Sequence, residues 1–316
     1  MAAGPGELTR GSGRRILAFD IGATKLAVAL GRDNGEIVRE FVSPSPGGAA
    51  FEPMWNLAIE LGEKLVALCG PPDVIGVSIG GPIDSRRGVV QSPPNLPDWA
   101  DVPLGSLLSQ HFGVPAFVEH DAKAGALAEW LFGAGVGRTN LIFLTFGSGM
   151  GAGLIVDGRL LYGRGTRAGE VGHWRMADRG PFAYGKAGSF ESFASGIGLA
   201  RLAHERYPGR WPTDLTAKDL VAIARTGDDA SLDVIGESAT MLGRGVAYLV
   251  DLLSPEIVVL GSLAVRAGDL FLPRVQEVVD TECLDCNLPC PVVASALGEQ
   301  IGTIAALSSA IYHAAL

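Results

Sequence analysis

The sequence predicts an α/β protein with a duplicated architecture, and three observations support this. Residues 16–30 (ILAFDIGATKLAVAL) and 141–156 (LIFLTFGSGMGAGLIV) each read as an apolar strand, a glycine-containing turn and a second apolar strand. Strand patterns alternate with helix patterns along the rest of the chain, as in α/β proteins. Each hairpin opens a stretch of roughly a hundred residues with the same order of elements, which indicates a duplication.

The composition is that of a globular chain with an acidic balance. The 316 residues are 47% hydrophobic and 19% charged, and the formal net charge is −9. This charge argues against nucleic-acid binding and against an anionic membrane surface, since both need basic patches. No apolar run is long enough to span a bilayer, and the N-terminus has no secretory hydrophobic segment, so we expect a cytoplasmic protein. Four cysteines in a chain of this length are not a disulfide framework.

In the first half of the chain, residues 1–13 are glycine-rich without an apolar period, and we expect a disordered tail there. In the first predicted helix, Leu57, Leu61, Leu65 and Leu68 would form the buried face. The patterns predict strands at 37–42, 74–79 and 114–118, a small hairpin at 83–90, and helices at 53–69, 102–112 and 121–132.

In the second half, an irregular stretch from 160 to 190 follows the central hairpin, and a loop of that length inside a domain is usually functional. Thr216 and Asp219 have the spacing of a helix capping box. The patterns predict helices at 192–206, 217–225, 230–253, 270–280 and 299–314, and strands at 257–260 and 292–296.

The glycine run at 147–153 (GSGMGAG) has two interpretations. Glycines accept positive φ and let an anion approach the backbone amides, which together form an anion-binding concavity. The dinucleotide-binding fingerprint is excluded, because it requires a helix directly after the glycines and residues 154–156 read as a strand. A phosphate loop and a structural hairpin with packed glycines both stay open on these residues alone. If the two hairpins are a duplicated pair, their turns can face one polyphosphate from opposite sides.

Several motifs resemble those of the sugar-kinase branch of the actin-like ATPases. Residues 20–25 (DIGATK) resemble the first phosphate motif, residues 147–153 the second, and residues 258–262 (VVLGS) the adenosine motif. Within this superfamily the chain resembles the ROK (repressor, open reading frame, kinase) family over about residues 14–314. The sugar-site segments of that family match residues 170–173 (EVGH), residues 188–191 (GSFE) and Asn95 in PNLPDW.

The resemblance implies a duplicated ribonuclease H-like (actin-like ATPase) fold, an α/β fold of two lobes with an interlobe cleft. We expect a small N-terminal lobe at 14–120, completed by the C-terminal helix at 299–316. A larger C-terminal lobe would occupy 121–298. Homodimers are common in the family, so we expect a homodimer.

The resemblance also implies an ATP-dependent kinase that phosphorylates a hexose hydroxyl. Glucose is the first expectation; fructose, mannose and N-acetylhexosamines are alternatives. A sugar-responsive repressor is a different class, and it needs a DNA-binding domain ahead of the first strand, where this sequence has a short tail. A sugar-binding protein without kinase activity is a third class, and the presence of Asp20, Lys25 and Asp121 argues against it.

The resemblance assigns a role to each site residue. Asp121 would be the general base that accepts the proton of the sugar hydroxyl, although it could instead be a helix N-cap. Asp20 would hold Mg²⁺ through water, and Lys25 would neutralise phosphate charge. The other implied ATP-binding residues are Gly22, Thr24, Gly147, Ser148, Gly149, Gly261 and Ser262. The implied sugar-binding residues are Gly81, Asn95, His120, Asp121, Glu170, His173 and Glu191, each of which taken alone could be an ordinary loop residue.

Two features depart from the family pattern. His120 stands where the family usually has an asparagine, and an imidazole offers fewer hydrogen bonds than an amide, so the sugar preference can differ. Phe182, Tyr184 and Ser189 stand where most members have the cysteines that bind structural zinc with the conserved histidine. We therefore expect no structural zinc, aromatic packing in its place, and a His173 that is free for a sugar hydroxyl or a structural hydrogen bond.

A separate cysteine cluster lies late in the chain. Cys283, Cys286 and Cys290 are close enough in sequence to bind a metal if a fourth ligand comes from elsewhere. The alternative is a helix end and loop with free thiols. The sequence alone leaves both open.

Overall fold

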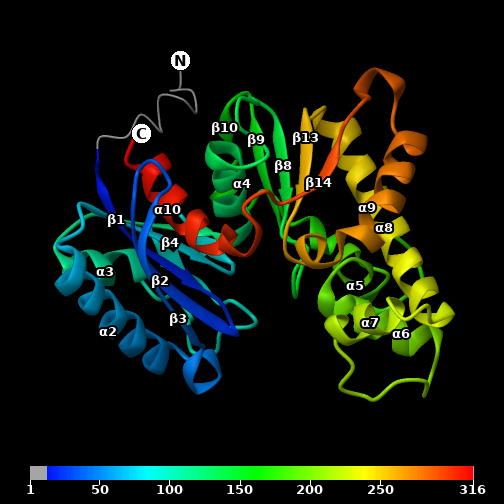
Figure 1. The fold of residues 1–316 in the computed structure, drawn as a ribbon, viewed down its shortest axis with the longest axis horizontal. Helices are drawn as coiled ribbons and strands as arrows, with labels where there is room; N and C mark the ends of the chain where they lie inside the picture. Colours follow the sequence, from blue (N-terminus) through cyan, green and yellow to red (C-terminus); the bar gives the residue numbers. More distant parts are fainter. Residues whose placement is uncertain (1–12, 316) are drawn as a thin grey trace. The chain divides into compact units, whose positions relative to one another are not determined.

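The computed structural model describes residues 13–315, in which contacts divide the chain into two compact units (Figure 1). The first unit takes the chain up to Arg138, together with Asp157–Ala168 and the C-terminal part from Glu299. The second unit is Thr139–Val156 and Gly169–Gly298. The predicted tail at 1–13 lies outside the described residues except for Gly13.

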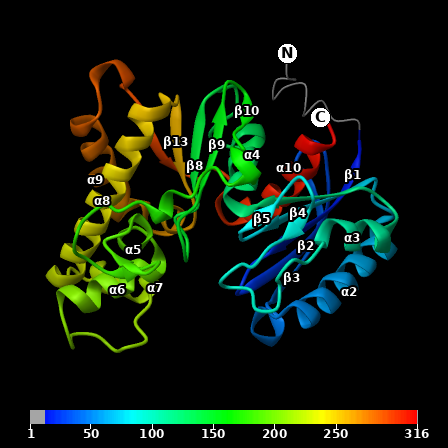
Figure 2. The same cartoon turned by 180° about the vertical axis from the view of Figure 1, so that it is seen from behind.

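The first unit is built on a five-stranded sheet with the order β3-β2-β1-β4-β7, in which the first three strands are antiparallel and β1, β4 and β7 are parallel. Helices α2 and α3 cover one face of this sheet, and α10 covers the other with α4 packed against it (Figures 1 and 2). The strands are β1 (Arg15–Ile21), β2 (Lys25–Arg32), β3 (Ile37–Pro44), β4 (Val74–Ile79) and β7 (Ala116–His120). The helices are α2 (Phe51–Cys69), α3 (Leu104–Phe112), α4 (Asp121–Phe132) and α10 (Ile301–His313), and the short elements are η1 (Pro46–Ala49), β5 (Ile83–Asp84) and β6 (Val89–Val90).

The second unit contains a sheet with the order β10-β9-β8-β13-β14, in which β8 and β9 are antiparallel and β8, β13 and β14 are parallel. Its strands are β8 (Leu141–Leu144), β9 (Ala152–Val156), β10 (Arg159–Leu160), β13 (Ile257–Leu260) and β14 (Val292–Ala294). Its helices are α5 (Phe190–Phe193), α6 (Gly196–Arg206), α7 (Ala217–Ala224), α8 (Asp229–Leu253) and α9 (Ser262–Glu282). The short elements are η2 (Arg164–Thr166), η3 (Val171–His173), β11 (Phe182–Ala183), β12 (Lys186–Ala187), η4 (Asp285–Asn287) and η5 (Gly298–Gln300).

The two sheets have the same plan, which confirms the predicted duplication. Each begins with a hairpin whose first strand becomes the central strand, and two later strands then add to it in parallel. Both predicted hairpins are present at their predicted positions, as β1–β2 and β8–β9. The glycine-containing turns therefore occupy equivalent places in the two sheets.

Each unit has its own hydrophobic core. In the first, Phe19 on β1 packs with residues of α2 such as Leu65, and both are fully buried. In the second, the rings of Phe146 and Phe271 meet edge to face with centroids 5.1 Å apart. Because burying a side chain of this size contributes about 1.5–3 kcal/mol, each core holds its own sheet and helices together.

The prediction for the buried face of α2 is wrong at its end. Leu68 is 57% exposed, and the buried stripe of the helix includes Met54, Ala58, Leu61 and Leu65. These positions follow the i, i+4, i+7, i+11 spacing of one helix face. Leu68 lies in the last turn, where the side chain is left in solvent.

Two helix predictions also need correction. The helix predicted at 192–206 is two helices, α5 and α6, because Ser195 adopts an extended conformation and its Oγ accepts from the Gly198 amide at 3.0 Å as an N-cap. The helix predicted at 270–280 begins at Ser262. Gly268 and Pro273 weaken the helix signal in the sequence, yet the chain leaves helical dihedrals only at Ala267.

The division of the chain differs from the lobes expected from the sequence. We placed a boundary at residue 120, but α4 packs against α10 and therefore belongs by its contacts to the first unit. Ten of the twelve residues of α4 are buried. An all-round buried helix has no single apolar stripe from which its partner could have been inferred.

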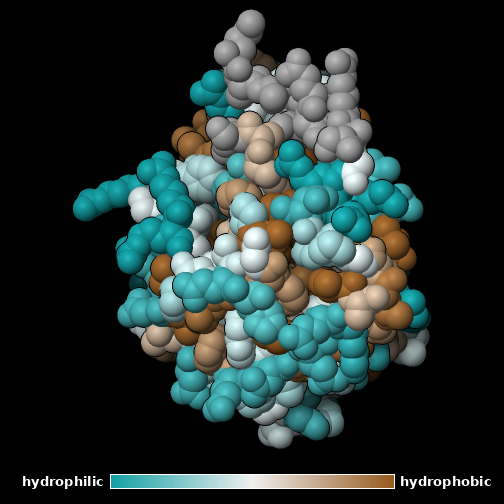
Figure 3. Space-filling model, turned by 90° about the vertical axis from the view of Figure 1, so that its left-hand side faces the viewer, coloured by the Kyte–Doolittle hydropathy of each residue, from teal (hydrophilic) through white to brown (hydrophobic). Residues whose placement is uncertain are grey.

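Within residues 13–315, no helix is both long enough and apolar enough to cross a membrane. Figure 3 shows the face that carries α2 and α3, on which hydrophilic residues surround smaller hydrophobic areas. Leu68 of α2 and Val42 of β3 are among the exposed apolar side chains of the first unit. Scattered exposed apolar residues of this kind are normal for a protein surface.

Candidate active site

The first hairpin ends in a compact turn that presents Asp20 and Lys25. Across the turn the Gly22 amide donates to Lys25 O at 2.9 Å, and Ser45 Oγ donates to Gly22 O at 2.7 Å. Lys25 Nζ lies 3.4 Å from Asp20 Oδ2, and Thr24 is exposed at the tip. The structure thus brings all four predicted residues of this turn together.

The Asp20 carboxylate lies in a crowded place, and its side chain is only 18% exposed. A Cβ atom at Gly302, in the first turn of α10, would lie 2.1 Å from Asp20 Oδ2, so the helix can approach only because this residue is glycine. Burial raises the pKa of Asp20; Lys25 opposes this, and the charges of Asp121 and Glu40 add to it, so the pKa lies above its ordinary value.

The second functional element of this unit is the junction of β7 and α4. Asp121 is the first residue of α4, and the N-cap is His120, whose Nδ1 accepts from the Ala122 amide at 3.2 Å. Asp121 Oδ1 accepts from the same amide at 2.6 Å and lies 3.2 Å from His120 Nδ1. The Asp121 side chain is 48% exposed. The N-cap role that we considered for Asp121 therefore falls to His120, and the Asp121 carboxylate is accessible.

Gly81 and Asn95 lie in loops of the same unit. A Cβ at Gly81 would lie 2.4 Å from His120 Cδ2, so the His120 ring packs directly on this glycine. Asn95 is exposed in the loop that follows β6. The buried Trp99 anchors that loop, since its indole Nε1 donates to Ala49 O at 2.9 Å.

In the second unit, the glycine turn between β8 and β9 is held by its own hydrogen bonds. Gly147 N donates to Gly149 O at 3.1 Å, and Gly151 N donates to Thr145 Oγ1 at 3.0 Å. Within residues 13–315, no acceptor is found for the amides of Ser148 and Gly149. Two successive amides without an acceptor are suited to receive an anion, which favours the phosphate-loop interpretation over a purely structural hairpin.

The predicted adenosine motif lies beside this turn. Gly261 N donates to Leu144 O at 2.8 Å, and Gly261 is the N-cap of α9. A Cβ at Gly147 would lie 3.3 Å from Ser262 Oγ. Two motifs separated by more than a hundred residues in sequence therefore meet in the structure.

Glu191 organises the predicted sugar segment. Its Oε2 accepts from the Met150 amide at 2.8 Å, so α5 is tied to the glycine turn. Gly172 of the EVGH segment packs on Glu191, since a Cβ there would lie 3.3 Å from the Glu191 Cβ. Glu170 and His173 lie at either end of η3, and both are exposed.

Tyr184 takes a packing role at one of the positions where the family has a zinc-binding cysteine. Its ring stacks on His173 with a centroid separation of 3.8 Å and an interplanar angle of 26°. Burial, followed by its hydrogen bond to Glu191, raises the pKa of Tyr184, so the phenol stays protonated as a donor. His173 is thus engaged by an aromatic ring, whereas we expected it to be free for a sugar hydroxyl or a structural hydrogen bond.

The other two positions behave differently from our expectation. Ser189 is the N-cap of α5, with Oγ accepting from Ser192 N at 3.2 Å. Phe182 is 64% exposed, so the predicted aromatic packing holds for Tyr184 and is wrong for Phe182.

The late cysteines are a buried pair and one exposed thiol. Cys283 and Cys290 are buried, and Cys286 is exposed. Burial, with nearby negative charge, raises the pKa of both Cys283 and Cys290 to about 11, so both are protonated thiols at neutral pH. Among the described residues, no group of three or more His, Cys, Asp or Glu side chains is placed to hold a metal ion.

Glu119 had no predicted role, although its carboxylate is fully buried next to His120. The signal available was a charged residue inside the otherwise apolar strand AFVEH, since charges are rarely buried without partners. Its partners come from distant segments, which no local pattern announces.

Comparison with known proteins places the chain in a family. Residues 16–312 match the ROK family. The glucokinase of Thermotoga maritima is 32% identical over 93% of this chain and 96% of its own length, and the xylose repressor of Caldicellulosiruptor bescii is 33% identical over 84% of this chain and 70% of its own. The structure of a ROK family glucokinase from Streptomyces griseus in complex with glucose and AMPPNP superposes with a TM-score of 0.81, at 28% identity over 94% of this chain and 99% of that one. The chain belongs to the ROK family and has its duplicated ribonuclease H-like (actin-like ATPase) fold.

Proposed function

We propose that this protein is an ATP-dependent sugar kinase that phosphorylates a hexose hydroxyl, with glucose as the expected substrate. The observation that carries the proposal is the accessible Asp121 carboxylate at the start of α4, close enough to Asp20 for the two charges to interact. Glucokinases among the relatives, one of them with bound glucose and AMPPNP, support the substrate class.

Asp121 is proposed as the general base. A carboxylate can accept the proton of a sugar hydroxyl as the phosphoryl group arrives, while most of the catalysis of phosphoryl transfer is positioning and charge stabilisation. The N-cap bond of His120 to the Ala122 amide fixes the first turn of α4 and therefore the base. The half-exposed side chain leaves room for a hydroxyl to reach it.

Asp20 is proposed to hold Mg²⁺ through water. Burial is the main cause that raises the pKa of Asp20, and the charges of Asp121 and Glu40 add to it, so a bound cation would favour the ionised carboxylate. Mg²⁺ uses one or two carboxylates together with waters and substrate phosphates, so a cluster of protein ligands is not required. When bound, the ion supplies charge neutralisation at the phosphates.

Further nucleotide-binding roles are proposed within each unit by itself. In the first unit Gly22 and Thr24 form the turn, and Lys25 supplies a positive charge for a phosphate. In the second unit the amides of Ser148 and Gly149 are proposed to bind phosphate oxygens. Their neighbours in that role are Gly147, Gly261 and Ser262.

Sugar-binding roles are proposed for polar groups of each unit taken by itself. Glu191 is held by the Met150 amide and by Tyr184, so its carboxylate is oriented before a sugar binds. Oriented acceptors discriminate strongly among polyhydroxy ligands, because a missing partner leaves a buried polar group unpaired. The other proposed contacts are Gly81, Asn95, His120, Glu170 and His173.

A sugar-responsive regulator is the second candidate, because a xylose repressor is as similar in sequence as the glucokinases. The two candidates differ in one observable: a regulator binds sugar without releasing ADP.

We also propose that the kinase forms a homodimer, which light scattering of the purified protein would test.

The deciding experiment is a coupled ADP-release assay with Mg·ATP and a panel of hexoses and amino-hexoses, with calorimetry of sugar binding alongside. We expect ADP release with at least one hexose. Sugar binding without ADP release across the panel would favour the regulator, and the absence of both would overturn the proposal.

A further inference from the structure

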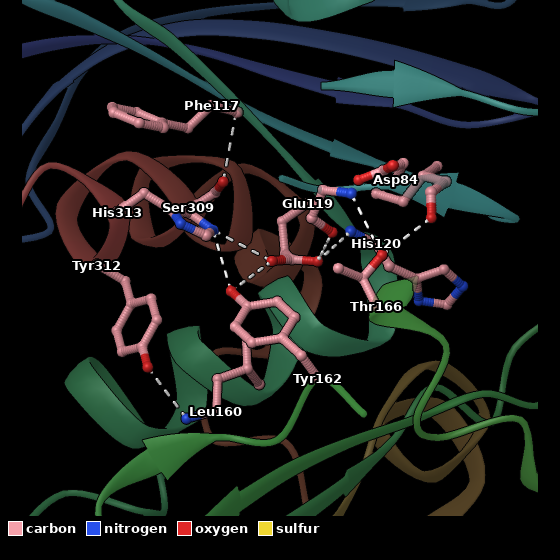
Figure 4. A network of polar contacts seen from close by, with 12 residues as sticks. Asp84, Phe117, Glu119, His120, Leu160, Tyr162, Thr166, Ser309, Tyr312 and His313 are labelled. Atoms are coloured by element: carbon pink, nitrogen blue, oxygen red, sulfur yellow. Dashed lines mark hydrogen bonds and ion pairs between the residues drawn. The ribbon is translucent and has the colours of Figure 1, made fainter. Parts of the chain in front are cut away.

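The buried carboxylate of Glu119 lies at the centre of a polar cluster that joins four segments of the first unit (Figure 4). Its Oε1 accepts from Ser85 Oγ at 2.6 Å and from the His120 amide at 2.9 Å. Its Oε2 accepts from Tyr162 OH at 2.9 Å and lies 3.1 Å from His313 Nε2. We refer to Glu119, Ser85, Tyr162 and His313 as the Glu119 cluster.

Ser85 and His313 are themselves held in place by neighbours outside the cluster. Ser85 N donates to Thr166 Oγ1 at 3.3 Å, and Thr166 Oγ1 donates to Ile83 O at 3.2 Å. The His313 ring stacks on Phe117 with centroids 5.5 Å apart and an interplanar angle of 13°. Strand β7, the segment after β5, the 157–168 segment and the end of α10 therefore converge on one carboxylate (Figure 4).

The partners around this carboxylate favour its charged form. Burial on its own would raise the pKa of Glu119, but the hydrogen bond and charge of His313, the Ser85 hydroxyl and the His120 amide outweigh it, and the pKa lies below its ordinary value. Burial and the charge of Glu119 raise the pKa of Tyr162, which stays a hydrogen-bond donor. Both carboxylate oxygens thus face donors.

Stability alone does not account for a buried charge at this position. Replacing a buried ion pair with apolar residues of similar volume is often neutral or stabilising, because the desolvation cost of the charges is removed. Glu119 is the one acidic residue of β7, whose sequence is AFVEH. A charged group that must find all its partners does, however, fix the geometry of the segments around it.

The fixed geometry is that of the β7–α4 junction. Glu119 Oε1 holds the amide of His120, and His120 Nδ1 in turn holds the Ala122 amide, so Asp121 lies between two anchored peptide units. We infer that the Glu119 cluster positions the Asp121 carboxylate, and that His313, on the C-terminal helix, is a positioning residue for the proposed reaction. This inference rests on the proposed kinase function.

The test compares Glu119→Gln and Tyr162→Phe with Tyr312→Phe. The first two remove a charge or a donor from the cluster. Tyr312→Phe removes the hydrogen bond that Leu160 N donates to Tyr312 OH at 3.2 Å, beside His313 in α10, and leaves the contacts of Glu119 intact. Misplacing a catalytic group by about 1 Å can cost about 10²-fold in rate. We expect kcat to fall by about 10–10²-fold in Glu119→Gln and less in Tyr162→Phe, with KM for the sugar nearly unchanged. The control should keep the wild-type kcat.

A second readout does not depend on activity. The chain has five histidines, so ring signals of isotope-labelled histidine can be assigned by substitution, and the signal of His120 reports on the junction. We expect the His120 signal to shift in Glu119→Gln and in Tyr162→Phe and to keep its position in Tyr312→Phe.

These outcomes separate two failures. An inactive wild-type protein would overturn the proposed function, and the His120 signal would then decide the inference. A folded Glu119→Gln protein with wild-type kcat and a wild-type His120 signal would overturn the inference while the function stands. If Glu119→Gln does not fold, the same readouts on Tyr162→Phe decide. A lower melting temperature with kcat and the His120 signal unchanged would show a merely structural role.

Discussion

At position 121 one carboxylate has two possible roles, which a single substitution separates. A negative charge in the first turn of a helix is worth about 0.3–1 kcal/mol through the helix dipole, whereas a general base is worth about 10²–10⁴-fold in rate. Asp121→Asn keeps the shape of the side chain but cannot accept a proton. We expect kcat to fall by about 10²–10⁴-fold while the sugar still binds, measured by steady-state kinetics and calorimetry.

The chain offers a matched control for that substitution. Asp229 is the first residue of α8, the same helix position in the second unit, after the N-cap Asp228. Asp229→Asn should cost a similar small amount of stability and leave kcat unchanged. A near-normal kcat in a folded Asp121→Asn protein would remove Asp121 from the mechanism.

Asp20 is where function and stability should oppose each other. Because burial and the charges of Asp121 and Glu40 raise the pKa of Asp20, its ionised form destabilises the metal-free fold at neutral pH. Asp20→Asn should therefore abolish Mg·ATP-dependent turnover. The same substitution should raise the melting temperature at pH 7. Lys25, which loses its partner, is 44% exposed and can be solvated. A clear fall in melting temperature would show that the Asp20–Lys25 pair stabilises the fold.

His120 combines a structural task with a proposed substrate contact. Its Nδ1 caps α4 and its ring packs on Gly81. Asparagine is an equally suitable N-cap, so His120→Asn should keep the helix start while it changes the groups offered to a ring hydroxyl. We expect the ranking of sugars across a panel to change more than turnover on the best one. An unchanged ranking would mean that the imidazole faces away from the sugar.

At the scale of elements, the sequence correctly predicted the hairpins and helices that short-range interactions define. Both glycine hairpins, the 121–132 helix and the Thr216–Asp219 capping box are confirmed, since turn chemistry and short-range bonds define them. The break before Ser195 and the early start of α9 were missed, because they depend on a capping bond and on tertiary packing that overrides Gly268 and Pro273.

In the loop that carries the EVGH segment, the aromatic ring of Tyr184 packs against His173. Tyr184 stacks on His173 and donates to Glu191. Tyr184→Phe keeps the stack and loses the hydrogen bond, whereas Tyr184→Ala loses both. Sugar KM should therefore rise slightly in the first variant and severalfold in the second, with kcat changed less, because binding groups and not the base are disturbed. Equal KM values in all three proteins would show that the stack does not serve sugar binding.

At the scale of the whole molecule, the duplication explains why the two glycine-containing turns could be predicted from the sequence alone. Equivalent hairpins open the two sheets, so the residues after their first strands recur as recognisable turns. The Glu119 cluster could not be found this way. Glu119 and His313 lie 194 positions apart, and nothing in the C-terminal helix signals that its last residue faces a buried carboxylate. Contacts of that range follow from the fold and not from a local pattern.

The stability of the folded state in acid should depend on two carboxylates whose pKa values are shifted in opposite directions. The pKa of Glu119 is lowered in the folded state, so its stabilisation is present above the ordinary glutamate value of about 4.3 and is lost as pH falls through the folded pKa. The pKa of Asp20 is raised, so the folded state gains stability as pH falls through that raised value toward the ordinary aspartate value of about 3.9.

Melting temperatures measured from pH 7 to pH 3 would separate these contributions. Glu119→Gln should be less stable than wild type at pH 7. The difference should shrink as the pH falls below the ordinary glutamate value of about 4.3 toward the lowered folded pKa, where the wild-type carboxylate loses its charge. Asp20→Asn should lose its advantage over wild type as the solution is acidified, since wild type is then protonated at the same position. Tyr312→Phe removes a hydrogen bond but no carboxylate, so its melting temperature should change with pH in parallel with that of wild type. A Glu119→Gln curve parallel to wild type throughout would mean that the Glu119 pKa is not lowered, and therefore that its four donors do not stabilise a charge.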